Sequence, residues 1–248
     1  MNRGGKPIHL SPRLESIARL VTPGNRVADI GTDHAYLPIF LCQNGKAPSA
    51  IAADLRSGPL RIASANICRA GLEDRIRVRQ SDGVSAFQYA ETETLIIAGM
   101  GGRLICHILE EGLSILPGFR EIILQPQAEI CQVRRFLADH DIRISDETCT
   151  EDEGKFYPVI RAVPVSEVSE NTDTPARKIY SEEELAYGPC LLHDRNPLLY
   201  NWLMRRLALT KQIEEELNGR ASTSSSVRLE ELGKEEQLLR TALRYYEM

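Results

Sequence analysis

The chain has 248 residues, 42% of them hydrophobic, which is enough for one large domain or for a medium-sized domain with an appendage. Its net charge of −5 does not indicate a nucleic-acid-binding protein, although residues 1–26 carry five basic side chains against a single acid. No apolar run approaches the roughly 20 residues that cross a bilayer, and the N-terminus resembles no signal peptide. We therefore expect a cytoplasmic protein with no membrane partner.

The six cysteines are scattered, without a Cys-x-x-Cys pair and without clustered histidines. This distribution favours buried free thiols over a zinc site or a disulfide framework. We expect no metal.

A first helix is predicted over residues 10–20, where apolar residues follow helical spacing. Short apolar runs then alternate with helical segments along the next hundred residues. Strands are predicted at 27–30, 50–53, 76–78, 94–98 and 121–124, and helices at 37–43, 57–71, 103–111 and 129–138. Such alternation is typical of a parallel, doubly wound α/β sheet.

Two further strands are predicted at 143–148 and 156–162, separated by an acidic turn rather than a helix. They would form an antiparallel hairpin. A dinucleotide dehydrogenase would continue with βαβ units, whereas a terminal hairpin is what Rossmann-like S-adenosylmethionine-dependent methyltransferases have. We expect residues 1–163 to form a seven-stranded methyltransferase domain of this kind.

Residues 164–248 are predicted to be a linker followed by a helical domain. Residues 164–175 are acidic and aperiodic, as in a linker. Two coiled-coil stripes follow, at Leu199, Trp202, Leu209 and Ile213 and at Leu229, Leu232, Leu239, Leu243 and Tyr246. One register pairs 199 with 246, 202 with 243 and 213 with 232, which predicts an antiparallel helical hairpin around residues 221–226. Arg206 and Glu236 interrupt the stripes and would pair or be solvated.

The stretch from Val27 to Pro38 reads as a strand, a sharp loop and a helix start. Such junctions lie at the carboxyl ends of parallel strands, where ligands bind and where free backbone N–H groups are available. Gly31 has no Cβ, so a ligand can approach its backbone closely. The same residues would also fit an ordinary turn, with Thr32 or Asp33 capping the helix.

Three acids recur at predicted strand ends. Asp54, at the end of the second strand, can accept two hydrogen bonds from ribose hydroxyls. Asp82 is placed to accept from an adenine amino group, and Gly83 lets the base pack on the backbone. Asp29 or Asp33 could engage the ammonium of a methionine moiety. The alternative is that these acids cap helices.

A glycine-rich stretch follows the fourth strand: Ala98, Gly99, Met100, Gly101 and Gly102. It leaves room for a planar substrate to lie against the main chain. Enzymes of this class that methylate amino groups often carry Asn-Pro-Pro or Asp-Pro-Pro here, and that motif is missing. The sequence therefore favours a ring nitrogen as acceptor, whose in-plane lone pair attacks without prior deprotonation, so a general base is optional.

Taken together, these motifs resemble the bacterial tRNA adenine-N1 methyltransferases that modify adenine 22 of the tRNA D-loop. The resemblance spans the chain and rests on residues 29–38, 81–83, 97–102, 124–126 and 154–157. It implies S-adenosylmethionine as methyl donor and tRNA as substrate. Where family members can carry Glu at the end of the second strand, this chain has Asp54, which keeps the carboxylate.

Asp33 and His34 are the polar residues expected nearest to both cofactor and target base, and we assign them the catalytic roles. His34 could instead support its neighbours through hydrogen bonds. Cofactor-binding residues are expected at Asp29, Gly31, Asp54, Asp82, Gly83, Ala98, Gly99 and Met100. Substrate-binding residues are expected at Tyr36, Gly101, Gly102, Gln125 and Tyr157, with Tyr36 either stacking on a base or packing under the loop.

Two other functions fit the same pattern. The chain could methylate a small metabolite, in which case RNA binding would not show the salt dependence of phosphate contacts. It could also bind the cofactor without turnover and recruit partners through its coiled coil. The helical hairpin, with Arg205, Arg206 and Lys211, could hold tRNA or be a dimerising or structural element. We favour a monomer.

Overall fold

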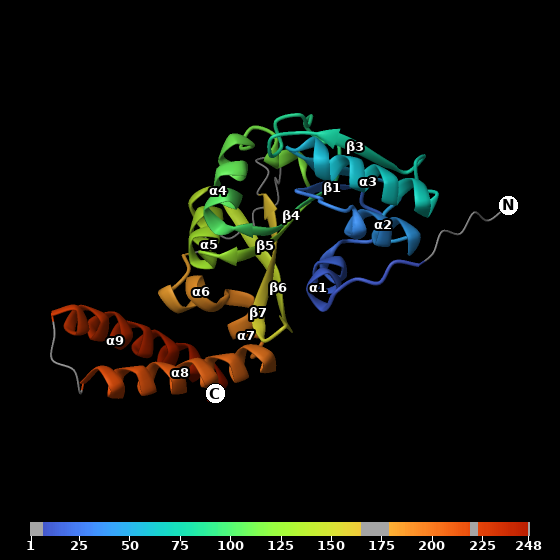
Figure 1. The fold of residues 1–248 in the computed structure, drawn as a ribbon. Coiled ribbons are helices and arrows are strands. Elements are labelled where there is room, and N and C mark those ends of the chain that lie inside the picture. Colours follow the sequence, from blue (N-terminus) through green and yellow to red (C-terminus); the bar gives the residue numbers. More distant parts are fainter. Residues whose placement is uncertain (1–6, 165–178, 219–222, 248) are drawn as a thin grey trace. The chain divides into compact units, whose positions relative to one another are not determined.

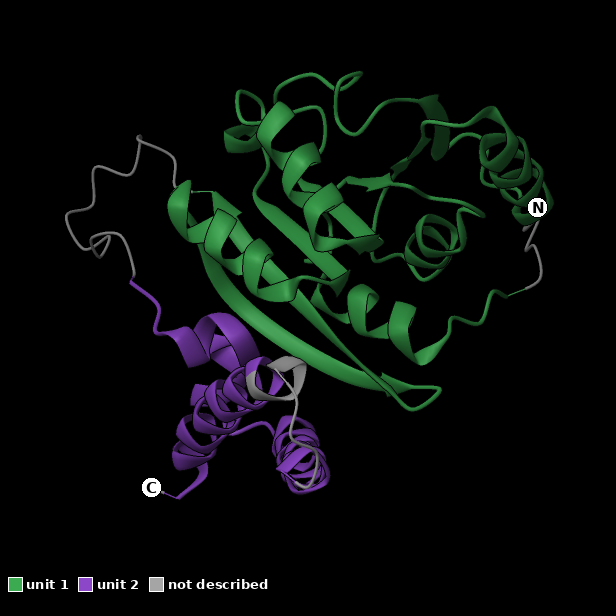
Figure 2. Cartoon of the chain, turned by 60° about the vertical axis from the view of Figure 1, so that its left-hand side comes forward, with its two compact units in different colours: residues 1–178 green, residues 179–248 purple. Residues whose placement is uncertain are grey.

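The computed structural model describes residues 7–164, 179–218 and 223–247 (Figure 1). The chain divides into two compact units, Met1–Lys178 and Ile179–Met248 (Figure 2). Most of the predicted linker, residues 165–175, lies outside the described residues.

The first unit is built on a seven-stranded sheet in the order β3-β2-β1-β4-β5-β7-β6. The first five strands are parallel, and β7 is antiparallel to both β5 and β6. This arrangement confirms the Rossmann-like methyltransferase fold with its terminal antiparallel hairpin. The strands are β1 (Val27–Ile30), β2 (Ala50–Asp54), β3 (Ile76–Gln80), β4 (Thr94–Gly101), β5 (Glu121–Ala128), β6 (Ile142–Asp152) and β7 (Lys155–Pro164).

Helices cover both faces of this sheet. One group is α1 (Pro12–Leu20), α2 (Tyr36–Gln43) and α3 (Ser57–Ala70), and the other is α4 (Gly102–Glu111) and α5 (Ile130–Asp139), with a short 3-10 turn η1 (Leu116–Gly118). The two groups lie on opposite sides of the strands (Figure 1). The long strands β4 to β7 extend beyond their predicted ends, so β4 already includes Gly99, Met100 and Gly101.

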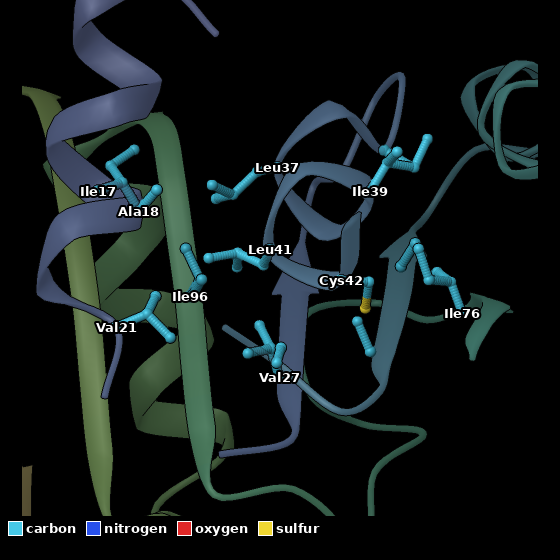
Figure 3. Packing of buried hydrophobic residues seen from close by; sticks show 14 of the residues in the cluster. Ile17, Ala18, Val21, Val27, Leu37, Ile39, Leu41, Cys42, Ile76 and Ile96 are labelled. Carbon is cyan, nitrogen blue, oxygen red and sulfur yellow. The ribbon is translucent and has the colours of Figure 1, made fainter. Parts of the chain in front are cut away.

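A buried apolar cluster fixes α1 and α2 against the sheet. Ile17 of α1, Leu41 of α2 and Ile96 of β4 are fully buried. Figure 3 shows Ile17 and Ala18 directed toward the same core as Leu41 and Ile96. Helix α1 begins at Pro12 behind the N-cap Ser11, whose hydroxyl accepts from the Leu14 N–H. The cap and the core together hold the N-terminal helix beside the carboxyl ends of the strands.

The second unit is helical, as predicted: α6 (Glu182–Tyr187), α7 (Pro189–His193), α8 (Pro197–Asn218), α9 (Thr223–Leu243) and the turn η2 (Arg244–Tyr246). Helices α8 and α9 pack together in antiparallel order, since Tyr200 contacts Tyr246 while Arg206 pairs with Glu235. The predicted turn at 221–226 is wrong from residue 223 onward, because α9 begins at Thr223, and residues 221 and 222 lie outside the described residues.

The predicted coiled-coil phase is partly wrong. Leu203 and Thr210 are buried, whereas Leu209, assigned to the stripe, is 45% exposed. On α9, Ala242 is fully buried. The contact stripe is therefore displaced by one residue along part of each helix, so Arg206 pairs with Glu235 at 2.5 Å instead of with Glu236, which pairs with Arg240.

Candidate active site

The loop between β1 and α2 has an unusual backbone. Gly31, Asp33 and Ala35 all have positive φ, at 73°, 49° and 58°. The N–H groups of Gly31 and Thr32 both donate to the Ala53 carbonyl of β2, which ties the loop to the sheet. Ala35 is the N-cap of α2, and no side chain caps that helix. The capping interpretation of Thr32 and Asp33 is therefore wrong, and their side chains are left for another role.

A cavity of about 300 Å³ opens at this loop, at the carboxyl ends of β1 and β4. It brings together seven of the predicted site residues: Asp29, Gly31, Asp33, His34, Tyr36, Ala98 and Gly99. Five further residues line it that the prediction did not assign to the site: Arg13, Leu14, Thr32, Leu37 and Gln127. Parallel α/β sheets bind ligands in this position.

Asp29 is the buried acid of the cavity. Burial is the main reason why its pKa rises to about 7, and the charge of Asp54 on the neighbouring strand adds to the shift. The Thr32 side chain acts in the opposite direction. A cationic group bound beside such a carboxyl group stabilises its ionised form and lowers its pKa again.

Asp33, His34 and Tyr36 form the outer rim. The Asp33 Oδ2 and His34 Nε2 atoms are 3.3 Å apart, and the His34 ring stacks on Tyr36 with centroids 5.2 Å apart. The Asn66 side chain donates to the His34 carbonyl, which holds the loop in place. The His34 Nδ1 atom is buried and has no hydrogen-bond partner within the described part of the chain. A ligand group in the cavity would satisfy this atom.

The glycine-rich end of β4 is irregular, because its pairing with β5 shifts at Ala98/Met100 and again at Met100/Gly101. Gly99 has φ of 77°, and a Cβ there would lie 3.2 Å from the Arg13 guanidinium. The Met100 methyl fills the space where Gly31 lacks a Cβ. A Cβ on Gly102 would clash with the Ala128 and Glu129 carbonyls. Gly102 is thus needed for packing, and neither Gly101 nor Gly102 lines the cavity.

The other two predicted acids lie at the ends of β2 and β3, on the same side of β1. Asp54 is buried at the end of β2, and its Oδ1 accepts from the Arg56 N–H at 2.8 Å. Asp82 is exposed just after β3, beside Gly83, whose backbone has φ of 50° and packs on Ile108. Neither acid nor Gly83 lines the cavity. Because β3, β2 and β1 are neighbouring parallel strands, the three acids lie side by side at the carboxyl ends of these strands.

Gln125 and Tyr157 reach the site indirectly. Gln125 is fully buried on β5, and its Oε1 accepts from Arg13 Nη1 at 2.9 Å. The Arg13 guanidinium lies 5.8 Å from the centre of the Tyr157 ring on β7. In the sequence, Arg13 stands out only as part of a basic N-terminal segment. No local pattern reveals its position, because its partner Gln125 is 112 residues away.

The polar groups of the site suit those of S-adenosylmethionine. Carboxylates of Asp29 and Asp33 suit the cationic groups of the methionine end, and the buried Asp54 suits ribose hydroxyls. Gly31 lines the cavity, but the Met100 methyl fills the space beside it where a Cβ would lie, so the missing side chain serves the packing of β4 on β1. Within the described residues, no group of three or more His, Cys, Asp or Glu side chains could hold a metal ion. No helix of the described chain is long and apolar enough to span a membrane.

Comparison with known proteins agrees with this geometry. A family model described as tRNA (adenine(22)-N(1))-methyltransferase matches residues 27–241. A tRNA (adenine(22)-N(1))-methyltransferase of Bacillus subtilis (strain 168) is 34% identical over 237 residues, which are 95% of this chain and 98% of the relative.

Two solved structures extend the likeness to liganded proteins. A Streptococcus pneumoniae protein in complex with S-adenosyl-L-methionine is 32% identical, with a TM-score of 0.79, and the match covers 95% of this chain and all of that one. TrmK of M. capricolum in complex with S-adenosyl-homocysteine is 25% identical, with a TM-score of 0.78, over 95% of this chain and 98% of that one. Fold, site and sequence agree: the chain belongs to the tRNA (adenine(22)-N(1))-methyltransferase family.

Proposed function

We propose that this protein transfers a methyl group from S-adenosylmethionine to N1 of adenine 22 in tRNA. Membership of the family gives the reaction and the substrate. The observation that carries the proposal is the cavity at the ends of β1 and β4, with two carboxylates in its lining. When bound, the cofactor supplies a methyl group activated by a positively charged sulfur.

In this proposal the cofactor lies across the carboxyl ends of β3, β2, β1 and β4. Asp54 accepts hydrogen bonds from the ribose hydroxyls, and Asp82 with Gly83 holds the adenine. Asp29 and Asp33 stabilise the cationic methionine end, against the backbone of Gly31. Ala98, Gly99 and Met100 complete this wall. Each role follows from charge and position in the fold.

The target adenine would enter from the outer rim. Tyr36, already stacked on His34, is 43% exposed and offers an aromatic surface. Stacking on such a surface favours a base that has left its own stack. Asp33 beside His34 would orient the adenine ring. Gln125 and Tyr157 would shape the far side of the cavity by holding Arg13 in place. Gly101 would allow close approach of the base.

The residues of the site need not remove a proton. N1 of adenine carries its lone pair in the ring plane, so the main work is to align two reactants and to exclude water. The product ring is positively charged, and Asp33 at the rim would stabilise that charge. We also propose that a monomer acts, in the cytoplasm, where its tRNA substrate is found.

The test is methyl transfer from labelled S-adenosylmethionine to unmodified tRNA, followed by nucleoside analysis. We expect the label in N1-methyladenosine. Label in another nucleoside would contradict the assigned acceptor atom. Cofactor binding without any transfer to RNA would contradict the assigned substrate.

A further inference from the structure

Arg13 is positioned in the cavity by three parts of the fold. Helix α1 carries it, Gln125 of β5 accepts from its Nη1 at 2.9 Å, and the Tyr157 ring of β7 lies 5.8 Å from its guanidinium carbon. Gly99 of β4 faces the same group, at the distance where a Cβ would already be crowded. A guanidinium that is held this firmly loses little conformational entropy when it binds a ligand.

The charge of Arg13 is not neutralised by any carboxylate among the described residues. None lies within 4.0 Å of its guanidinium, whereas Arg19 on the same helix pairs with Glu15 and Arg103 pairs with Glu129. Nη1 makes the only hydrogen bond found for this side chain in the described part of the chain. Its remaining N–H groups are available to a ligand.

The charges of the cavity complement those of one end of the cofactor. The methionine end of S-adenosylmethionine carries two positive groups, the ammonium and the sulfonium, and one negative group, the carboxylate. The cavity lining contains two carboxylates, Asp29 and Asp33, and one guanidinium, Arg13. We propose that Arg13 binds the carboxylate of the cofactor's methionine moiety and so sets the position of the sulfonium. This inference rests on the proposed function.

A phosphate of the tRNA is the other anion that could reach a guanidinium here. Arg13 shares its cavity with the buried Asp29 and with Gly31 at the end of β1. A carboxylate on a flexible tail can enter this space beside the two acids. A phosphodiester would have to bring its backbone toward the same acids, which repel it. The geometry therefore favours the cofactor.

The experiment measures binding by titration calorimetry, without tRNA. Two ligands are compared, S-adenosylmethionine and its decarboxylated form, for the wild type and for Arg13→Gln, Arg13→Lys and Arg19→Gln. Arg19 is the matched control, because it is an arginine of the same helix whose side chain is 78% exposed. Thermal unfolding of each variant shows whether it is folded.

We expect the wild type to bind S-adenosylmethionine about ten- to a hundredfold more tightly than the decarboxylated ligand, as for a hydrogen-bonded ion pair. Arg13→Gln should lose most of this preference, Arg13→Lys should keep part of it, and Arg19→Gln should keep all of it. If Arg13→Gln does not fold, the preference for S-adenosylmethionine is compared between Arg13→Lys and Arg19→Gln instead.

Two results would overturn the inference. If Arg13→Gln weakens both ligands equally, Arg13 only supports the fold. If Arg13→Gln keeps the full preference for S-adenosylmethionine, Arg13 does not bind the carboxylate. A separate titration with tRNA, in which the salt dependence of binding falls by about one phosphate contact in this variant, would then show that Arg13 binds RNA. Failure of the wild type to bind either ligand would instead contradict the proposed function.

Discussion

The terminal methyl of Met100 occupies the position that a side chain on Gly31 would need. This contact joins the ends of β1 and β4 at the cavity. Gly31 also has a φ of 73°, where an L-residue costs about 1–2 kcal/mol.

Gly31→Ala should therefore lower both stability and cofactor affinity. Gly45→Ala is the matched control, because Gly45 has a φ of 67° and a Cβ there would meet no atom of the described residues within 4 Å. We expect the control to lose about 2–4 °C in Tm, as roughly 1 kcal/mol does in a domain of this size, and Gly31→Ala to lose more. Adding Met100→Ala should restore part of the difference. Equal losses in both single variants would show that the Met100 contact is unimportant.

Asp33→Asn should abolish most of the methyl transfer and leave the fold intact. The side chain is 64% exposed, and Asn tolerates the left-handed backbone at this position. We expect kcat/KM for tRNA to fall at least about tenfold, with Tm unchanged within about 2 °C, as for loss of one charge at a reacting centre. Asp141→Asn, at another acid with φ of 56°, should leave activity unchanged. Near-normal activity of Asp33→Asn would remove Asp33 from the mechanism.

Cofactor binding should depend on pH through Asp29. Its pKa of about 7 in the free protein means that the carboxyl group is largely neutral at pH 6 and largely ionised at pH 8. Because the ligand is cationic, affinity for S-adenosylmethionine should rise several-fold between pH 6 and pH 7.5. Asp29→Asn should bind more weakly, and its affinity should change little over this range. A wild-type affinity that is constant with pH would contradict the assignment.

The same shift predicts how stability responds to pH. The pKa of Asp29 in the folded protein lies above its ordinary value of 3.8, so folding is favoured when the group is protonated and is opposed increasingly as pH rises toward 7. In the absence of ligand, Asp29→Asn should therefore raise Tm more at pH 8 than at pH 5. Equal changes at the two pH values would show that Asp29 ionises normally.

The helical unit offers a test of its register. Arg206 and Glu235 are 39% and 26% exposed and pair at 2.5 Å, so a double-mutant cycle with alanine should give a coupling of about 0.5–1 kcal/mol. The exposed pair Lys234 and Glu230 on α9 is the control and should show no measurable coupling. Coupling of Arg206 to Glu236 instead would restore the register predicted from the apolar spacing.

The sequence was sufficient to predict the sheet, because the central strands β1, β2, β4 and β5 begin as buried apolar runs and the remaining strands are bounded by turn residues. It also located the loop after β1, since Gly31 and the polar residues after it stand out at a strand end. It was harder to predict which residues of α8 and α9 face each other. Trp202 and Leu203 are both apolar, and the buried neighbour of the exposed Leu209 is the polar Thr210, so apolar spacing alone did not decide which residues face the partner helix.

Contacts distant in sequence could not be predicted. Arg13 reaches the cavity only because α1 packs through Ile17 and Ala18 on the core, and because β5 and β7 bring Gln125 and Tyr157 beside it. Gly102 was assigned to the substrate for its place in a glycine-rich stretch. Its surroundings, the Ala128 and Glu129 carbonyls, depend on how β5 ends.

The most direct test of the central claim uses two tRNA transcripts that differ only at position 22, one with adenine and one with guanine. Methyl transfer is followed with labelled S-adenosylmethionine, and the modified site is mapped by primer extension. We expect N1-methyladenosine at position 22 of the first transcript and no incorporation into the second. Equal labelling of both transcripts, or a modified base elsewhere, would contradict the proposed function.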